Sequence, residues 1–301
     1  EMDVVLTPEQ EAFRQEVRAF AAEAVTPELL QRTNGAIEAY VPEFHRAVAA
    51  RGWIGVQWPR EFGGRGATPL EMAVFFEEMG RALAPLGRYV GSTVFVGGSI
   101  ISYGRQDQRA EFLSRIAAGK LLGSFALTEP EAGSDAAAIR TSAVRDGDHW
   151  VVRGEKVFIS GAELADCILT VVRTDPEAGK YRGISLLLVP GDAPGLSVRP
   201  LHTVAGLRVN VVVYDEVRVP VDRLLGVEGN GWEHLQTTFG LERSLSSAQL
   251  VGSLFRLYND LHTVVLAEVR AGRFPVARLD DLYDCRAELE AARLLSYRAC
   301  W

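Results

Sequence analysis

Residues 125–135 read Phe-Ala-Leu-Thr-Glu-Pro-Glu-Ala-Gly-Ser-Asp, which is the most distinctive stretch of the chain. Its apolar start predicts the end of a strand, and Pro130 and Gly133 predict a turn after it. Hydroxyls and backbone N–H groups in such a turn can bind the polar edge of a heterocycle or a phosphate without cationic side chains. An ordinary strand-to-loop connection would read the same way, so this stretch alone leaves both interpretations open.

The surrounding residues, 120–228, have the pattern of a β domain. Asp146-Gly147-Asp148 predicts a turn, and therefore a hairpin that joins residues 141–144 to residues 150–153. No helical pattern separates the strands, which favours an antiparallel sandwich or barrel over βαβ units and a parallel sheet. The clearest strands are predicted at 149–154, 167–173, 183–189, 196–201 and 209–213.

Helical patterns flank the β region on both sides. Thr7 and Pro8 predict the start of a first helix, whose apolar residues recur at helical spacing. We therefore expect an α+β fold with an N-terminal helical domain at 1–119, a central β domain at 120–228 and a C-terminal helical domain at 229–301. Two antiparallel helices rarely close a core, so more helix or another subunit should cover the apolar faces of the last domain. Further helices are predicted at 41–50, 69–81, 88–103, 107–118, 232–271 and 279–301.

Composition excludes several classes of protein. The 301 residues include 39 acidic and 32 basic side chains, and a net charge of -7 argues against nucleic-acid binding. Cys167, Cys285 and Cys300 lack the spacing of a disulfide framework or a zinc site, so we expect no metal and three buried thiols in a reducing compartment. No signal peptide is recognisable, and no run approaches the roughly 18 apolar residues that span a membrane. We expect a cytoplasmic protein.

Three further motifs accompany the opening stretch, in the same helical, β, helical order. They are residues 58–64 (Trp-Pro-Arg-Glu-Phe-Gly-Gly), 156–162 (Lys-Val-Phe-Ile-Ser-Gly-Ala) and 217–226 (Val-Arg-Val-Pro-Val-Asp-Arg-Leu-Leu-Gly). Together the four motifs closely resemble the acyl-CoA dehydrogenase family of flavoproteins, from about Leu6 to Trp301. The resemblance implies a helical domain, a β domain and a four-helix domain, with FAD between the last two and an adjoining subunit. It also implies α,β-desaturation of an acyl-CoA substrate, with electrons passing to an external acceptor.

The resemblance also assigns roles to individual residues. It implies that the segment from Phe125 through Gly133 to Ser134 lines the flavin, with Leu127 and Thr128 near the ring edge. Phe158 and Ser160 would cover the other side of the isoalloxazine and ribityl region, although Phe158 could also be an ordinary core residue. Ser134 would in addition lie at the mouth of the acyl-CoA channel.

The desaturation requires a base, because the α proton of a thioester is weakly acidic. Most family members carry this base on a late segment that these 301 residues do not reach, whereas some carry a glutamate on the first helix of the C-terminal domain. Residues 239–244 here read Phe-Gly-Leu-Glu-Arg-Ser, so the resemblance makes Glu242 the base and gives Arg243 a role in ordering the substrate end of the helix. The alternative is that the two form a charge pair on a helix surface.

Assembly is predicted from a departure from the family pattern. Members usually carry an arginine, then Phe-Gly, then His-Gln, which reach the flavin of a neighbouring subunit. Residues 271–281 here keep only Arg273-Phe274. The chain thus resembles an actinobacterial branch in which two unlike chains form a heterotetramer that acts on steroid CoA thioesters, and we favour this over a homotetrameric fatty-acyl enzyme. A non-catalytic partner subunit, or an acyl-CoA oxidase or flavin oxygenase, remains as an alternative.

Overall fold

The computed structural model describes residues 6–204 and 208–300. The described residues form two compact units. The first unit combines Glu1–Ile37, Ala67–Pro85 and Arg243–Trp301, and the second combines Glu38–Gly66 with Leu86–Glu242. The predicted domain boundaries after residues 119 and 228 stay a prediction.

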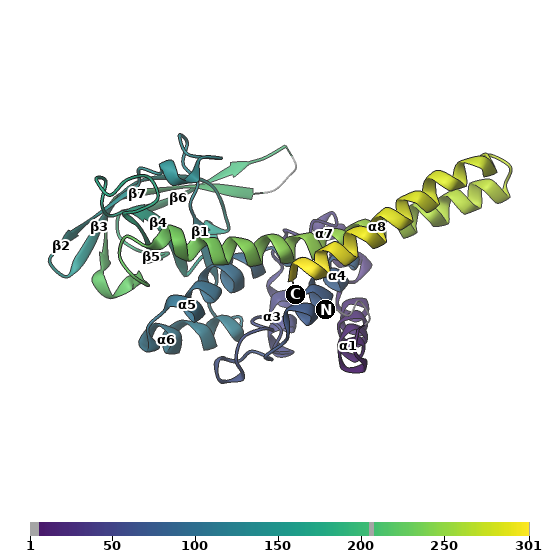
Figure 1. Cartoon of the computed structure of the whole chain (residues 1–301), viewed down its shortest axis with the longest axis horizontal. Coiled ribbons are helices and arrows are strands. Elements are labelled where there is room, and N and C mark those ends of the chain that lie inside the picture. The colour runs from purple at the N-terminus through teal and green to yellow at the C-terminus, as the bar shows by residue number, and fades with distance from the viewer. Residues whose placement is uncertain (1–5, 205–207, 301) are drawn as a thin grey trace. The chain divides into compact units, whose positions relative to one another are not determined.

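The first unit is helical. It contains α1 (Pro8–Ala24), α2 (Pro27–Thr33), α4 (Pro69–Arg81), the later part of α7 (Gly231–Arg270), and α8 (Leu279–Cys300), shown in Figure 1. Helix α1 begins as predicted, because the Thr7 hydroxyl accepts from the Gln10 backbone N–H and the Gln10 side chain accepts from the Thr7 N–H. Helix α2, which begins at Pro27 after the capping hydroxyl of Thr26, was not predicted.

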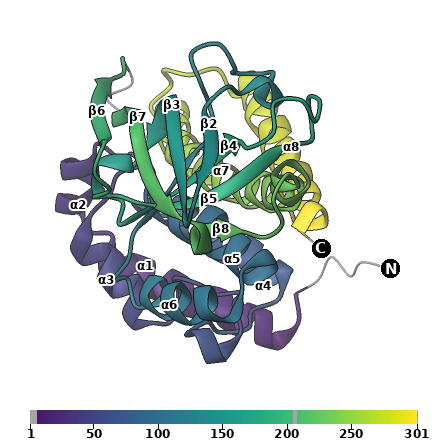
Figure 2. The same cartoon turned by 90° about the vertical axis from the view of Figure 1, so that its left-hand side faces the viewer.

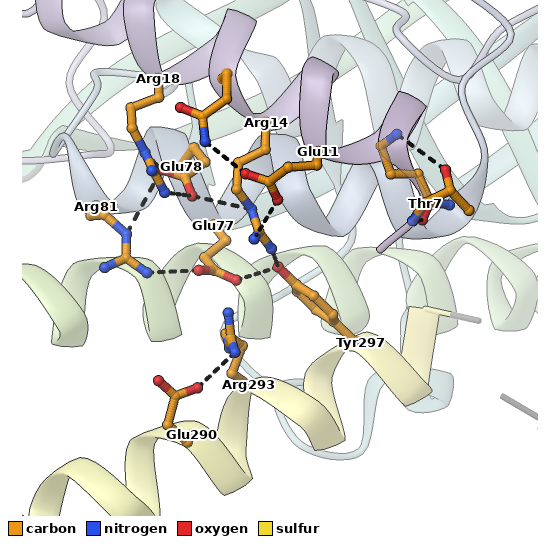
Figure 3. A network of polar contacts seen from close by, with 12 residues as sticks. Thr7, Glu11, Arg14, Arg18, Glu77, Glu78, Arg81, Glu290, Arg293 and Tyr297 are labelled. Atoms are coloured by element: carbon orange, nitrogen blue, oxygen red, sulfur yellow. Dashed lines mark hydrogen bonds and ion pairs between the residues drawn. The ribbon is translucent and has the colours of Figure 1, made fainter. Parts of the chain in front are cut away.

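Two adjacent carboxylates of α4 are buried in this unit, and Figure 3 shows their partners. Arg18 of α1 donates to both oxygens of Glu78, at 2.8 and 3.1 Å. Glu77 accepts from Arg81 at 2.7 Å and from the hydroxyl of Tyr297 on α8 at 2.6 Å. Because a buried carboxylate is stable only with partners, the network fixes α1 and α8 against α4.

Helices α4 and α7 cross with their backbones in contact. A Cβ atom on Gly80 would lie 2.0 Å from the carbonyl oxygen of Gln249, and one on Gly252 would lie 2.0 Å from that of Glu77. No side chain larger than hydrogen fits at such a distance, so the two glycines permit this crossing.

Helix α7 exposes an apolar stripe that begins at this crossing and continues toward the C-terminal end of the helix. Its members recur every three or four residues, which places them on one side of the helix. They are Leu250, Leu254, Leu257, Leu261 and Val264, with exposed fractions from 38% to 63%.

The second unit includes α3 (Pro42–Ala50), α5 (Gly98–Tyr103), α6 (Gln106–Ala117) and the first turns of α7. The helix predicted over 88–103 is instead a π-helix, η2 (Val90–Gly97), followed by α5. Gly91 and Gly97 let η2 approach its neighbours, since added Cβ atoms would lie 2.8 Å from the Gly123 oxygen and 2.2 Å from the Trp58 ring. Short 3₁₀ turns occupy Arg60–Phe62, Ala136–Ala138, Ala162–Leu164 and Val221–Arg223 in this unit, and Val276–Arg278 in the first.

Eight strands of the described residues form one sheet in the second unit, with the order β6-β7-β3-β2-β4-β5-β8 and with β1 beside β4 (Figures 1 and 2). The predicted hairpin is confirmed, since Asp146 pairs with His149 and leaves a two-residue turn. Most neighbours are antiparallel as predicted, but β4 pairs in parallel with β1 and, at one position, with β2. The strands are β1 (Gly123–Ala126), β2 (Ser142–Asp146), β3 (His149–Ser160), β4 (Cys167–Arg173), β5 (Ile184–Pro190), β6 (Leu196–His202), β7 (Arg208–Pro220) and β8 (Leu224–Leu225).

Strands β3 and β7 extend further than predicted. Their pairing passes through two irregularities, which explain why the predicted strands stop short. The register shifts between Val152 and Gly154, and again between Lys156 and Ile159. Each shift interrupts the alternation of inward and outward side chains from which strands are recognised in a sequence. The second shift contains Phe158, whose φ is 60°.

The cysteines differ in exposure. Cys167 is buried as predicted, but Cys300 is only partly buried and Cys285 is exposed on α8. The prediction of three buried thiols is therefore wrong for α8, because much of that helix is not covered. No helix among residues 6–204 and 208–300 combines the length and the apolar character needed to cross a bilayer.

Candidate functional site

The first group of predicted site residues lies on β1 and in the loop that follows it. Phe125, Leu127 and Thr128 are half-buried, whereas Gly133 and Ser134 are exposed. A Cβ atom added to Gly133 would meet nothing within 4 Å, so this side of the loop is open. Two hydrogen bonds hold the later part of the loop: Lys180 donates to Asp135 at 2.8 Å, and Arg173 donates to the carbonyl of Ala137 at 2.8 Å.

The second group lies on β3. Phe158 is 64% exposed, and its positive φ is rare for a bulky side chain. A bulge of this kind turns a side chain out of the regular alternation. Ser160, two residues later, is also exposed.

Backbone contacts bring these two groups together. The Val157 N–H donates to the carbonyl of Thr128 at 2.8 Å, and the Ser124 hydroxyl donates to the carbonyl of Ser160 at 2.8 Å. The ends of β1 and β3 therefore lie side by side. The predicted residues on either strand are neighbours in space although some thirty positions separate them in the chain.

A buried ion pair lies beneath this junction. Lys156 has no exposed side-chain surface, and its ammonium donates to Glu129 at 2.8 Å and to the carbonyl of Leu127 at 2.9 Å. Burial lowers the pKa of Lys156 to about 8, and the nearby Glu129 carboxylate opposes this shift. Burial alone would raise the pKa of Glu129, but Lys156 and hydrogen bonds from the 140–141 backbone lower it below its ordinary value.

Neither Glu129 nor Lys156 was predicted as a site residue. The sequence did contain a signal. Trp150, Val152 and Lys156 are separated by even numbers of residues, which places them on the same face of β3, and the first two are buried apolar residues. A charged residue that continues such a series must find a buried partner. Glu129 lies within the distinctive stretch at residues 125–135.

The first turns of α7 join this unit through aromatic contacts. The rings of Phe95 on η2 and Phe125 on β1 are stacked with centroids 4.2 Å apart. Phe239 of α7 packs edge-on against both, at 6.3 and 6.2 Å. Glu242 follows Phe239 by three residues, which places both on one side of the helix, and it is half-buried. Arg243, the next residue, is exposed.

The residues at the junction of β1 and β3 fit a flavin. The exposed ring of Phe158 offers a flat apolar surface, and two exposed hydroxyls, of Ser134 on the loop after β1 and of Ser160 on β3, offer polar contacts. The exposed Gly133 lets a ligand approach the backbone closely.

A cavity of about 510 Å³ lies elsewhere in the same unit, between α6 and the ends of β4 and β5. Its lining mixes charges of both signs, with Glu111 and Arg223 paired at 2.9 Å. It is lined by none of the residues predicted to form the site, and we assign it no role.

Comparison with known proteins agrees with this architecture. A model of the N-terminal domain of acyl-CoA dehydrogenases matches residues 7–120, and a model of their middle domain matches residues 124–217. The acyl-CoA dehydrogenase FadE29 of Mycobacterium tuberculosis is 38% identical over 96% of this chain and 74% of its own length. FadE26 of the same organism is 39% identical, and the match spans 84% of this chain but 65% of that protein.

Solved structures show the same likeness. The Tcur3481-Tcur3483 steroid ACAD superimposes with a TM-score of 0.88 at 35% identity, over 99% of this chain and 77% of the matched one. The ChsE4-ChsE5 complex from Mycobacterium tuberculosis gives 0.86 at 33% identity, over 99% and 77%. A glutaryl-coenzyme A dehydrogenase bound to glutaryl-CoA gives 0.89 at 28% identity, over 99% and 78%. With both domain models matched in order and relatives of this identity along nearly its whole length, the chain belongs to the acyl-CoA dehydrogenase family.

Proposed function

We propose that the chain acts as an FAD-dependent acyl-CoA dehydrogenase, which introduces an α,β double bond into an acyl thioester and passes electrons to an external acceptor. One observation carries this proposal: β1, β3 and the turn of α7 that ends in Glu242 belong to one compact unit. When bound, the flavin would supply the acceptor for the hydride that leaves the β carbon.

The chain's own residues would hold and orient both reactants. Phe158 would cover one face of the isoalloxazine, and Leu127 and Thr128 would contact the ring edge. Ser160 and the backbone at Gly133 would bind polar groups of the cofactor. The exposed Ser134 would lie where the CoA thioester enters. These roles follow from the resemblance, and the adjacency of β1 and β3 supports them.

Glu242 would remove the α proton. Its position on the same side of α7 as Phe239, whose ring packs on Phe125 of β1, supports a carboxylate that faces the proposed flavin site. Half-burial favours catalysis, because a base works best where water is excluded. Arg243 would order the substrate end of the helix.

The experiment that tests this role replaces Glu242 by Gln. We expect turnover to fall by a factor of at least about 100, because a positioned general base contributes roughly that much. Flavin content and its visible spectrum should not change. Glu233→Gln is the matched control, since Glu233 is an exposed glutamate on the same helix, and it should retain turnover.

Near-normal turnover of Glu242→Gln would place the base elsewhere and would favour the surface charge pair or a non-catalytic subunit. A purified chain that takes up no flavin, and shows no bleaching with any acyl-CoA, would contradict the proposed function itself. Rapid peroxide formation by the reduced protein in air would instead favour an acyl-CoA oxidase or flavin oxygenase.

We also propose a steroid CoA thioester as the substrate class and a heterotetramer with a paralogous chain as the assembly, in the cytoplasm. The steroid ACAD and the ChsE4-ChsE5 complex among the structural relatives support this. Arg273 supports it too. Its guanidinium, which the family pattern would direct to the flavin of a neighbouring subunit, instead binds Glu268 of its own chain at 2.6 and 2.7 Å. Native mass spectrometry with flavin quantitation, alone and with the paralogue, would give the stoichiometry, and a flavin-loaded homotetramer would contradict the heteromeric assembly.

A further inference from the structure

We propose that Lys156 is a positioning residue that holds the backbone of β1 and β3 in the geometry that receives the flavin. The proposal rests on the proposed function, because it names the flavin as the group that this backbone receives. Lys156 itself has no exposed surface, so it acts through the residues that it binds.

Lys156 connects segments that are distant in the chain. Its ammonium binds the carbonyl of Leu127 and the carboxylate of Glu129. That carboxylate also accepts from the backbone N–H groups of Arg140 and Thr141, at 2.7 and 2.9 Å. A single buried cation thus ties β3 to the end of β1 and, through Glu129, to the segment that leads into β2.

The strained backbone at Phe158 shows why the chain needs an anchor at Lys156. Phe158 lies two residues after Lys156, with a positive φ and an exposed ring. The residues on both sides of it are held: the Val157 N–H binds the carbonyl of Thr128, and the buried Asn210 amide donates to the carbonyl of Ile159 at 2.9 Å. A backbone in an unfavourable conformation persists only where its surroundings determine it.

An apolar side chain of similar length would fill the same space without this function. Burying an ammonium is costly, and well-packed apolar residues often replace a buried ion pair without loss of stability. Methionine at position 156 could not donate to Leu127, whose carbonyl would lose that partner. The ion pair of Lys156 therefore serves to fix the backbone geometry of β1 and β3 rather than to add stability.

The test compares Lys156→Met with the double variant Lys156→Met/Glu129→Gln in the full chain. The double variant leaves no uncompensated buried charge, and its side-chain amide oxygen can still accept from the N–H of either Arg140 or Thr141, though not from both. Lys120→Met is the matched control, because it removes an exposed lysine of the same unit that lies outside the loop after β1. Two readouts are measured: amide hydrogen exchange at residues 124–129 and 156–161 in the apoprotein, and the dissociation constant of FAD by quenching of its fluorescence.

We expect both Lys156 variants to exchange faster at the Val157 amide and to bind FAD at least about tenfold more weakly, the loss expected for one charged hydrogen bond. The double variant should fold, because it leaves no uncompensated buried charge, and Lys120→Met should match the wild type in both readouts. If Lys156→Met fails to fold, the double variant decides the question.

Wild-type affinity for FAD together with wild-type exchange in the double variant would overturn the proposal. A wild-type chain that binds no FAD would instead refute the proposed function. The exchange comparison would then still decide whether Lys156 holds this backbone, since it requires no cofactor.

Discussion

Phe158 combines a backbone strain with an exposed side chain, and the two can be separated by substitution. At ordinary positions glycine is less stable than alanine by roughly 0.5–1 kcal/mol. At a φ of 60° the order should reverse, because only glycine adopts this conformation without steric cost. We expect Phe158→Gly to unfold at higher denaturant concentration than Phe158→Ala, by about 1 kcal/mol in the free energy of unfolding.

Both substitutions remove the ring, so both should weaken FAD binding to the same extent. Equal stability of the two variants would mean that the backbone relaxes at position 158. Wild-type affinity for FAD in both would show that the ring does not cover the flavin.

Among the elements, the crossing of α4 and α7 depends on the absence of a side chain. Gly252→Ala should lower the free energy of unfolding by about 3 kcal/mol, the upper end for overpacking, because the obstructing atom is a backbone oxygen at 2.0 Å. Urea denaturation would measure the change.

Gly240→Ala is the control on the same helix. A Cβ atom there meets nothing within 4 Å, so alanine should raise the stability by up to about 1 kcal/mol through its greater helix propensity. The two substitutions are chemically identical, and their effects should have opposite signs. Destabilisation of similar size by both would contradict the predicted dependence on the crossing.

For the molecule as a whole, the apolar stripe of α7 is the feature that should govern association. An exposed row of leucines favours contact with another apolar surface. We expect the 301-residue chain to self-associate at micromolar concentration, and Leu257→Glu to weaken this at least about tenfold, since burial of one leucine contributes roughly 1.5–3 kcal/mol.

Sedimentation velocity over a concentration series would measure this association. Val144→Glu adds the same charge at a residue of similar exposure, 58% against 63%, on the hairpin of the other unit. It should leave the association unchanged. An equal effect of both substitutions would attribute the association to net charge rather than to the stripe.

Local patterns in the sequence by themselves determined a large part of the fold. The start of α1 at Thr7, the hairpin around Gly147 and the alternation of helical and β regions follow from capping, turn chemistry and periodicity. These signals are read within a few residues and need no distant partner. The four motifs likewise identified the family that the comparisons show. The roles assigned to Phe125, Phe158 and Glu242 stay predictions.

Only the tertiary structure decided which positions depart from those patterns. The π-helix η2 forms where two glycines allow close approach to β1 and Trp58, and the bulge at Phe158 exists because β3 and β7 shift register. Lys156 is buried because Glu129 and the carbonyl of Leu127 meet it there. Each depends on contacts between residues tens of positions apart, and these form only when the chain has folded.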